Sequence, residues 1–352
     1  MKDNRFLTLA IESSCDETAA AVLSGGRDVL SDVVSSQIEI HEKYGGVVPE
    51  IASRHHLTAV NSVIDEALDK AGVTLDDIDL VGVTCGPGLV GSLVIGIAAA
   101  KALAMAKDIP LVGVNHMYGH VSSNFIQYKE LEPPFLSLIV SGGHTSLVYM
   151  ESYTSCRVLG STRDDAAGEA YDKVARVIGL GYPGGPKIDR LAKEGDPEAI
   201  HFKRVYLEKG SFDFSFSGIK TGVLNYVNSQ KQAGRDINAA DVAAGFQEAV
   251  VEVLVNKAMD AAETTGSDSI VIAGGVAAND RLRKELASAC DEKKIKLYLP
   301  EKRLCTDNAS MIGCAAYYKY QAMGSDGLYL DAYPSLPVDA QIKITGDGET
   351  SW

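Results

Sequence analysis

The sequence predicts an α/β fold that contains two copies of one strand-rich unit. Residues 6–13 (FLTLAIES) have the pattern of a short buried strand, and residues 135–142 (FLSLIVSG) match them at Phe, Leu and Leu. Both runs continue through a polar turn into two further apolar strands, and this repeated order of elements indicates a duplication. Glycine-rich strand exits in both copies place ligands at the carboxyl ends of strands, so we expect a cleft between two halves.

Composition narrows the class of protein. The chain has 352 residues, 46% hydrophobic and 23% charged, which is typical of a globular protein with about two domains. The formal net charge of -14 argues against a chain that grips nucleic acid alone. A loose basic set in the middle third is expected to be mainly solvated surface: Lys203, Arg204, Lys209, Lys220 and Lys231.

The compartment follows from the cysteines and the apolar runs. The six cysteines form no C-x-x-C pair, and the start of the chain lacks the pattern of a signal peptide. No window has 18 consecutive apolar residues free of charges and turn formers. We therefore expect reduced thiols, a cytoplasmic location and no contact with a membrane.

Helices and strands alternate between and after the repeats. We expect helices over 49–70, 95–107 and 241–264, strands over 78–84, 111–114 and 269–273, and a further helix from about Asp280. The acidic segment 163–175 is predicted as helix, with Asp164, Asp165, Glu169 and Asp172 along it. Residues 181–189 (GYPGGPKID) are predicted as a rigid turn.

Three glycine loops are candidate anion sites: 84–91 (TCGPGLVG), 141–145 (SGGHT) and 273–279 (AGGVAAN). Glycine lets backbone N–H groups approach a phosphate, and a helix start after such a loop favours negative charge. A single loop of this kind is more often plain turn chemistry. Three of them at the strand exits of a duplicated fold favour a nucleotide.

The segment NHMYGH (115–120) directly follows a predicted strand. On a helix, His116 and His120 lie one turn apart on the same face, at a spacing that suits Zn²⁺ or Fe²⁺. The H-E-x-x-H pattern of zinc proteases is absent, because Met117 follows His116. Asp307 is a candidate third ligand, although Thr306 or Asp307 is equally expected to cap the following helix.

Three further carboxylates are ambiguous in the same way. Glu12 ends a buried strand, where its carboxylate is a candidate base or could order a metal-bound water. The alternative is that segment 12–18 is a simple turn shaped by Asp16 and Thr18. Asp172 can accept hydrogen bonds from ribose hydroxyls or solvate a helix face. Asp189 is a hydroxyl acceptor or part of a plain loop.

Eight motifs together resemble the TsaD family, the tRNA threonylcarbamoyladenosine biosynthesis transferases formerly called glycoproteases. The resemblance covers about residues 6–335, in order: ESSCDET, YGGVVPEIASRHH, NHMYGH, SGGHTSL, DDAAGEAYDKVARVIGLGYPGGP, FSFSGIKT, AGGVAAN and TDNASMIG. It implies the duplicated actin-like/sugar-kinase ATPase (ASKHA) fold. We expect one domain over 1–133 plus 309–340, a second over 134–308, and a loosely ordered tail over 341–352.

The resemblance also implies an activity and a site. The activity is transfer of a threonylcarbamoyl group from threonylcarbamoyl-AMP to N6 of adenosine 37, in tRNAs that read codons starting with A. One divalent metal per subunit, Fe²⁺ or Zn²⁺, is implied on His116, His120 and Asp307, with TsaB and TsaE as protein partners. The implied adenylate site comprises Ile139, Val140, Ser141, Gly142, Gly143, Asp172, Gly185, Asp189 and Asn279.

Three other functions fit part of the pattern. An ASKHA-type ATPase or small-molecule kinase shares the fold and the glycine loops but does not need the histidine pair. A metalloprotease needs the glutamate that is missing after His116. A catalytically silent scaffold subunit is expected to lose the metal triad, which this chain keeps.

Overall fold

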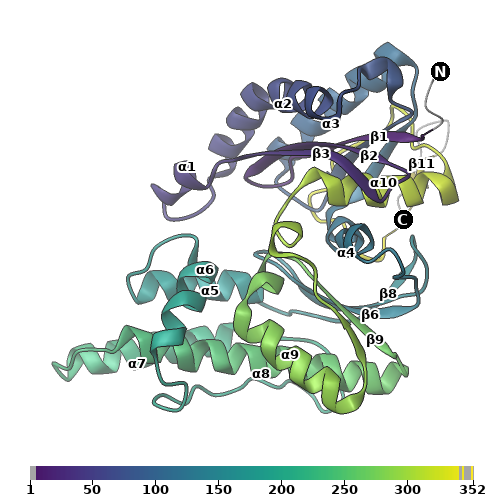
Figure 1. The fold of residues 1–352 in the computed structure, drawn as a ribbon. Coiled ribbons are helices and arrows are strands. Elements are labelled where there is room, and N and C mark those ends of the chain that lie inside the picture. The colour runs from purple at the N-terminus through teal and green to yellow at the C-terminus, as the bar shows by residue number, and fades with distance from the viewer. Residues whose placement is uncertain (1–4, 341–342, 345–349, 352) are drawn as a thin grey trace. The chain divides into compact units, whose positions relative to one another are not determined.

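The computed structural model describes residues 5–340, 343–344 and 350–351 (Figure 1). The chain divides into two compact units, which we describe separately. Unit 1 comprises Met1–Pro133, Met150–Cys156 and Thr306–Trp352, and unit 2 comprises Pro134–Tyr149 and Arg157–Cys305. This division differs from the expected domains by assigning 150–156 and 306–308 to unit 1, so Asp307 lies in the same unit as His116 and His120.

Unit 1 contains one five-stranded sheet and its helices. Its strands are β1 (Leu7–Glu12), β2 (Glu17–Ser24), β3 (Asp28–Ser36), β4 (Leu80–Gly86) and β5 (Leu111–Asn115). Its helices are α1 (Ile38–Glu42), α2 (Pro49–Ala71), α3 (Val90–Lys107), α4 (His116–Gln127) and α10 (Ala309–Met323), with a 3₁₀ turn at Leu75–Asp77. The expected loose tail lies largely outside the described residues, but β11 (Lys343–Ile344) pairs antiparallel with β12 (Thr350–Ser351).

Unit 2 repeats the same kind of sheet. Its strands are β6 (Phe135–Val140), β7 (Thr145–Met150), β8 (Cys156–Ser161), β9 (Ser269–Ala273) and β10 (Lys296–Tyr298). Its helices are α5 (Ala167–Val177), α6 (Gly184–Leu191), α7 (Ser217–Gln232), α8 (Ala239–Thr265) and α9 (Asp280–Lys293). Short 3₁₀ turns lie at Ala192–Glu194, Gly275–Ala278 and Lys302–Leu304.

The strand orders confirm the predicted duplication. Unit 1 has the order β3-β2-β1-β4-β5, and unit 2 has the equivalent order β8-β7-β6-β9-β10. In each sheet the first strand of the repeat pairs in parallel with the strand that follows a crossover, β1 with β4 and β6 with β9. The chain therefore has the duplicated α/β architecture that the resemblance to the TsaD family implies.

The helices of unit 1 cover both faces of its sheet. α2 and α3 pack on one face, while α4 and α10 pack on the other (Figure 1). By length and composition α3 could cross a membrane, the only such helix among the described residues. Its buried residues Leu93, Ile97, Ala100 and Ala104 belong to the core around β1 and β4, so α3 packs one face on the sheet.

Two local predictions were wrong. Residues 184–191 form helix α6 and not a turn, because Pro183 immediately precedes the first helical residue and the two glycines after it sit at the start of the helix. Helix α5 begins at Ala167, so Asp164 and Asp165 precede it. Asp164 instead accepts hydrogen bonds from the backbone N–H groups of Phe216 and Ser217 at the start of α7.

Helix α10 approaches the sheet closely because β4 carries a glycine beneath it. A Cβ atom at Gly82 would lie 2.5 Å from the Ala316 Cβ, which has no rotamer with which to move away. This close packing fixes the height of α10 above the sheet. It thereby also fixes the loop that precedes α10 and carries Asp307.

We predict that Gly82→Ala lowers the free energy of unfolding by about 1–3 kcal/mol, because overpacking forces the backbone to shift. Ala316→Gly added to Gly82→Ala should recover part of that loss, although glycine in a helix costs about 1 kcal/mol by itself. Urea unfolding of the two variants measures both effects. Equal stability of wild type and Gly82→Ala would contradict the proposed contact.

Candidate metal centre and glycine loops

The two histidines lie at the start of helix α4, as predicted. Strand β5 ends at Asn115, whose side-chain oxygen accepts a hydrogen bond from the N–H of Met117 and caps the helix. His116 is the first helical residue and His120 follows one turn later, so both imidazoles lie on one side. Their ring centroids are 4.6 Å apart, and both side chains are buried.

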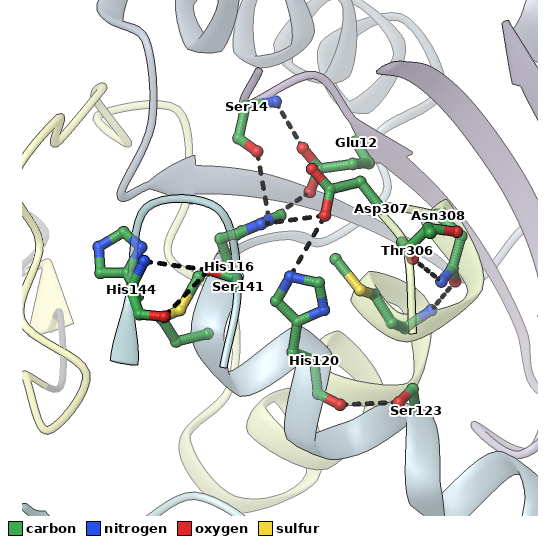
Figure 2. Close-up of polar contacts among 12 residues, drawn as sticks. Glu12, Ser14, His116, His120, Ser123, Ser141, His144, Thr306, Asp307 and Asn308 are labelled. Carbon is green, nitrogen blue, oxygen red and sulfur yellow. Dashed lines mark hydrogen bonds and ion pairs between the residues drawn. The ribbon is translucent and has the colours of Figure 1, made fainter. Parts of the chain in front are cut away.

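Asp307 lies in the loop before α10, and the expectation that it or Thr306 caps this helix was wrong. The cap is Asn308, whose side-chain oxygen accepts hydrogen bonds from the N–H of Met311 and the hydroxyl of Ser310. The Asp307 carboxylate is therefore not needed at the helix start. It points at the two histidines instead (Figure 2).

The distances within this cluster suit a metal ion. Asp307 Oδ1 lies 3.4 Å from His116 Nε2 and 3.2 Å from His120 Nε2. Bonds of about 2.1 Å to one cation separate neighbouring ligand atoms by about 3.0–3.4 Å. Among the described residues, neither ring nitrogen of the buried His120 has a hydrogen-bond partner, and Nε2 lies beside only the Asp307 carboxylate. A metal ion bound by Nε2 and this carboxylate would supply a partner for both, so the donor set fits a divalent cation.

Glu12 supports His116 from behind. Its carboxylate is fully buried, and Oε2 lies 3.0 Å from His116 Nδ1 (Figure 2). The same carboxylate accepts hydrogen bonds from the hydroxyl of Thr84 and the N–H of Ser14. A carboxylate only accepts, so the proton of the ring sits on Nδ1 and Nε2 is free to bind a metal.

Electrostatics at the centre also favour a cation. Burial opposes charge on His116, but the carboxylates of Glu12 and Asp307 raise the pKa of its imidazole well above the usual value. Burial likewise opposes charge on Asp307, yet His116 and His120 hold the pKa of that carboxyl far below its ordinary range. Burial, with the charges of Asp307 and Asp16, raises the pKa of Glu17 to about 10. A divalent metal would replace the second proton of the His116 imidazolium, the one on Nε2. Its charge would also offset the repulsion among these neighbouring carboxylates.

The loop after β1 is held by close backbone packing. A Cβ atom at Gly88 would lie 2.6 Å from the carbonyl oxygen of Ser14, and one at Gly96 would clash with Ser13 Oγ. Ser13 Oγ donates to the carbonyl of Ser92, and Leu89 N–H donates to the carbonyl of Ser14. The loop therefore presents Ser14 Oγ 3.2 Å from His116 Nδ1 in a defined position.

In unit 2 the predicted adenylate residues lie at the ends of β6 and β9. Ile139 and Val140 end β6, and the turn Ser141–His144 closes through Ser141 N–H to the His144 carbonyl. Gly274 and Gly168 come close to this turn, because Cβ atoms there would lie 2.5 Å from the Val140 oxygen and 2.6 Å from the Ser141 oxygen. A Cβ atom would meet only open space at several other glycines of the unit, among them Gly142, Gly143, Gly185 and Gly275.

The polar residues of this set have different partners. Asp172 Oδ1 accepts a hydrogen bond from the N–H of Gly184 at the start of α6. Asp189 Oδ1 is buried and has no hydrogen-bond partner in the part of the chain that the structure describes, and burial raises the pKa of this carboxyl. Asn279 caps helix α9 by accepting from Leu282 N–H and donates to Gln247 Oε1 at 2.7 Å. Its side chain is therefore already engaged.

Some supporting residues carry no clear signal in the sequence. Ser14 and Thr84 complete the hydrogen bonds of Glu12, and the buried Gln247 on α8 accepts a hydrogen bond from Asn279. The middle basic set is partly neutralised, because Lys220 pairs with Asp165 and Arg204 with Glu252.

The sequence is similar to a known protein family over most of its length. Residues 28–314 match the family model described as TsaD: tRNA N6-adenosine threonylcarbamoyltransferase. A Clostridium botulinum (strain Kyoto / Type A2) protein of that name is 58% identical over 328 residues, 93% of this chain and 96% of the relative. A Clostridium perfringens (strain SM101 / Type A) protein of that name is 56% identical over 333 residues, 95% and 98% of the two chains.

Solved structures with low identity share the fold. Full-length HypF in its phosphate- and nucleotide-bound form has a TM-score of 0.64 at 14% identity, covering 92% of this chain and 47% of HypF. Component A of the Acidaminococcus fermentans (R)-2-hydroxyglutaryl-CoA dehydratase has a TM-score of 0.52 at 16% identity, covering 90% and 99%. These likenesses concern the architecture alone.

Proposed function

The chain belongs to the TsaD family of tRNA N6-adenosine threonylcarbamoyltransferases, and we propose that it transfers threonylcarbamoyl from threonylcarbamoyl-AMP to N6 of adenosine 37 in tRNAs reading codons that start with A. In this reaction N6 forms a bond to the carbamoyl carbon, the bond from that carbon to the phosphate oxygen breaks, AMP leaves and N6 loses one proton. The observation that carries the proposal is the cluster of His116, His120 and Asp307 backed by Glu12.

The metal, Fe²⁺ or Zn²⁺, would be held by His116, His120 and Asp307. When bound it supplies a Lewis acid that polarises a carbonyl oxygen. Glu12 holds a proton on His116 Nδ1, so that Nε2 keeps its lone pair for the cation. Both oxygens of Glu12 already accept hydrogen bonds, which supports a role in orienting His116 over direct proton transfer to the substrate.

The adenylate would be held in unit 2 by Ile139–Gly143, Asp172, Gly185, Asp189 and Asn279. The open space beside Gly142, Gly143 and Gly185 would let a phosphate approach the backbone, whose N–H groups would stabilise the charge on departing AMP. The unpaired oxygen of Asp189 is an acceptor suited to a ribose hydroxyl. The side chain of Asn279 already bonds to Leu282 N–H and to Gln247, so it would contact the nucleotide only through its remaining hydrogen-bonding capacity.

The direct test is to incubate the chain with threonylcarbamoyl-AMP, its partner proteins and unmodified tRNA, and to analyse the nucleosides by mass spectrometry. We expect threonylcarbamoyladenosine to form. A γ-phosphate transfer from ATP that survives loss of both histidines, with no modified nucleoside, would support an ASKHA-type kinase instead.

We predict that His116→Ala and His120→Ala each lose the bound metal and the transfer activity while the fold persists, because each removes one of three protein ligands. Metal analysis of the purified variants, with circular dichroism as the check on folding, measures this. His55→Ala is the control, since His55 is exposed on α2. Full metal occupancy in both ligand variants would refute the assignment.

We predict that Asp172→Ala weakens binding of a non-hydrolysable adenylate analogue by about 1.5–3 kcal/mol, the range for a hydrogen bond to a charged group. Metal content should not change, because the metal ligands lie in unit 1. Glu169→Ala is the matched control on the same helix, with its carboxylate paired to Lys173 at the surface. Unchanged calorimetric affinity in Asp172→Ala would remove this residue from the site.

The family resemblance implies TsaB and TsaE as partners, and we propose that TsaB covers the outer face of α3. Val90, Val94 and Met105 are 56%, 46% and 70% exposed there. Ala98 and Ala102 continue this exposed face, and Lys101 is a charged residue within it. A paralogue with the same fold would bring an equivalent helix, and two such faces would bury each other. A cytoplasmic location agrees with tRNA as the substrate.

We predict that Val94→Glu or Met105→Glu abolishes the complex with TsaB, because a charge would be buried in an apolar contact. Tyr329→Glu is the control, since Tyr329 is 65% exposed and lies outside α3. Size-exclusion chromatography with light scattering on equimolar mixtures measures the outcome. Complex formation by both α3 variants would show that TsaB binds elsewhere.

A further inference from the structure

His56 is a fully buried histidine outside the metal cluster. It lies on α2 beside the exposed His55, and its ring faces the loop that follows β1. His56 Nε2 is 2.9 Å from the carbonyl oxygen of Cys15, and Nδ1 is 2.8 Å from Thr18 Oγ1. Both ring nitrogens are therefore used by one short segment.

The chemistry of the partners fixes the roles of the two nitrogens. A carbonyl oxygen only accepts, so His56 Nε2 carries the proton and donates to Cys15. Nδ1 is then the acceptor, and the Thr18 hydroxyl donates to it. Burial lowers the pKa of His56, which agrees with a neutral ring in this position. The ring thus bridges the two ends of the segment from Cys15 to Thr18 in one tautomer.

This segment directly continues the residues that orient His116. Glu12 and Ser14, immediately before it, both reach His116 Nδ1. The first half of the loop is anchored on α3 and the segment before it, through Ser92 and Leu89. The second half is anchored by His56 and by the N–H of Gln37, which donates to the Asp16 carbonyl. Without His56, the partly buried carbonyl of Cys15 and the buried hydroxyl of Thr18 would lose this partner.

We propose that His56 is a positioning residue for the metal centre, which acts by holding the loop of Glu12 and Ser14 against His116. The proposal rests on the proposed function, since it needs a metal on His116, His120 and Asp307. A histidine that only filled the core would stabilise unit 1 without affecting how tightly or in which geometry a cation is bound.

The test is titration of the metal-free full-length chain with Co²⁺, recording the dissociation constant and the visible absorption bands, which report ligand geometry. His56→Phe keeps the ring shape but removes both hydrogen bonds. We expect it to weaken Co²⁺ binding by about 10-fold or more and to alter the bands, the size seen when an outer-shell partner of a metal ligand is lost. His56→Gln keeps a donor and an acceptor, and should recover part of the affinity.

Two further variants keep the test decisive. His55→Phe alters the neighbouring exposed ring and should bind Co²⁺ as wild type does. Thr18→Val removes one hydrogen bond at nearly constant volume, and should weaken binding several-fold even if His56→Phe does not fold. Wild-type affinity and bands in Thr18→Val, together with the same result in whichever His56 variants fold, would overturn the proposal.

The same titration distinguishes failure of the positioning role of His56 from failure of the metal-ligand assignment. His116→Ala should lose Co²⁺ binding altogether. If it binds Co²⁺ as tightly as wild type, the metal assignment fails and the role of His56 fails with it. If His116→Ala loses the metal while the His56 and Thr18 variants keep it unchanged, only the positioning role is wrong.

Discussion

The buried hydrogen bond between Glu12 and His116 is the interaction on which the candidate metal centre depends. It joins the end of β1 to the start of α4, two elements separated by about a hundred residues in the sequence. A buried carboxylate is costly unless it is fully paired, and Glu12 meets this condition with His116, Thr84 and Ser14. The arrangement determines which nitrogen of His116 faces Asp307, and therefore what the cluster can bind.

Glycine makes this arrangement possible by letting main chain and helices come close. Gly82 allows α10 to lie low on the sheet, and Gly88 and Gly96 let the loop after β1 rest against α3. The three candidate ligands come from a helix start and a loop whose positions both depend on these close approaches. A small shift of either element would change the distances between candidate ligand atoms, which a metal tolerates only within a few tenths of an ångström.

Periodicity and repetition were enough to predict the fold, because the duplicated strands and the long helices differ clearly in their apolar pattern. The exact residues at which helices begin were harder to predict. Asp307 and Asn308 are adjacent and both are good helix caps, so only the hydrogen bond from Met311 distinguishes cap from candidate ligand. His56 and Thr84 act through residues distant in sequence, and no spacing rule connects them to His116.

The two copies of the sheet show how one scaffold carries different chemistry. Strand β1 ends in Glu12, whereas β6, its counterpart, ends in Val140 and is followed by the turn of Ser141 to His144. Strand β9 is followed by Gly274 and Gly275, where β4 leads into Gly86 and Gly88 packed against the chain. One copy therefore has buried carboxylate and imidazole groups at its strand ends, and the other has glycines with open space beside them. The proposed cation site and the proposed adenylate site would thus occupy equivalent strand ends of the two copies, because the side chains there differ while the strand order does not.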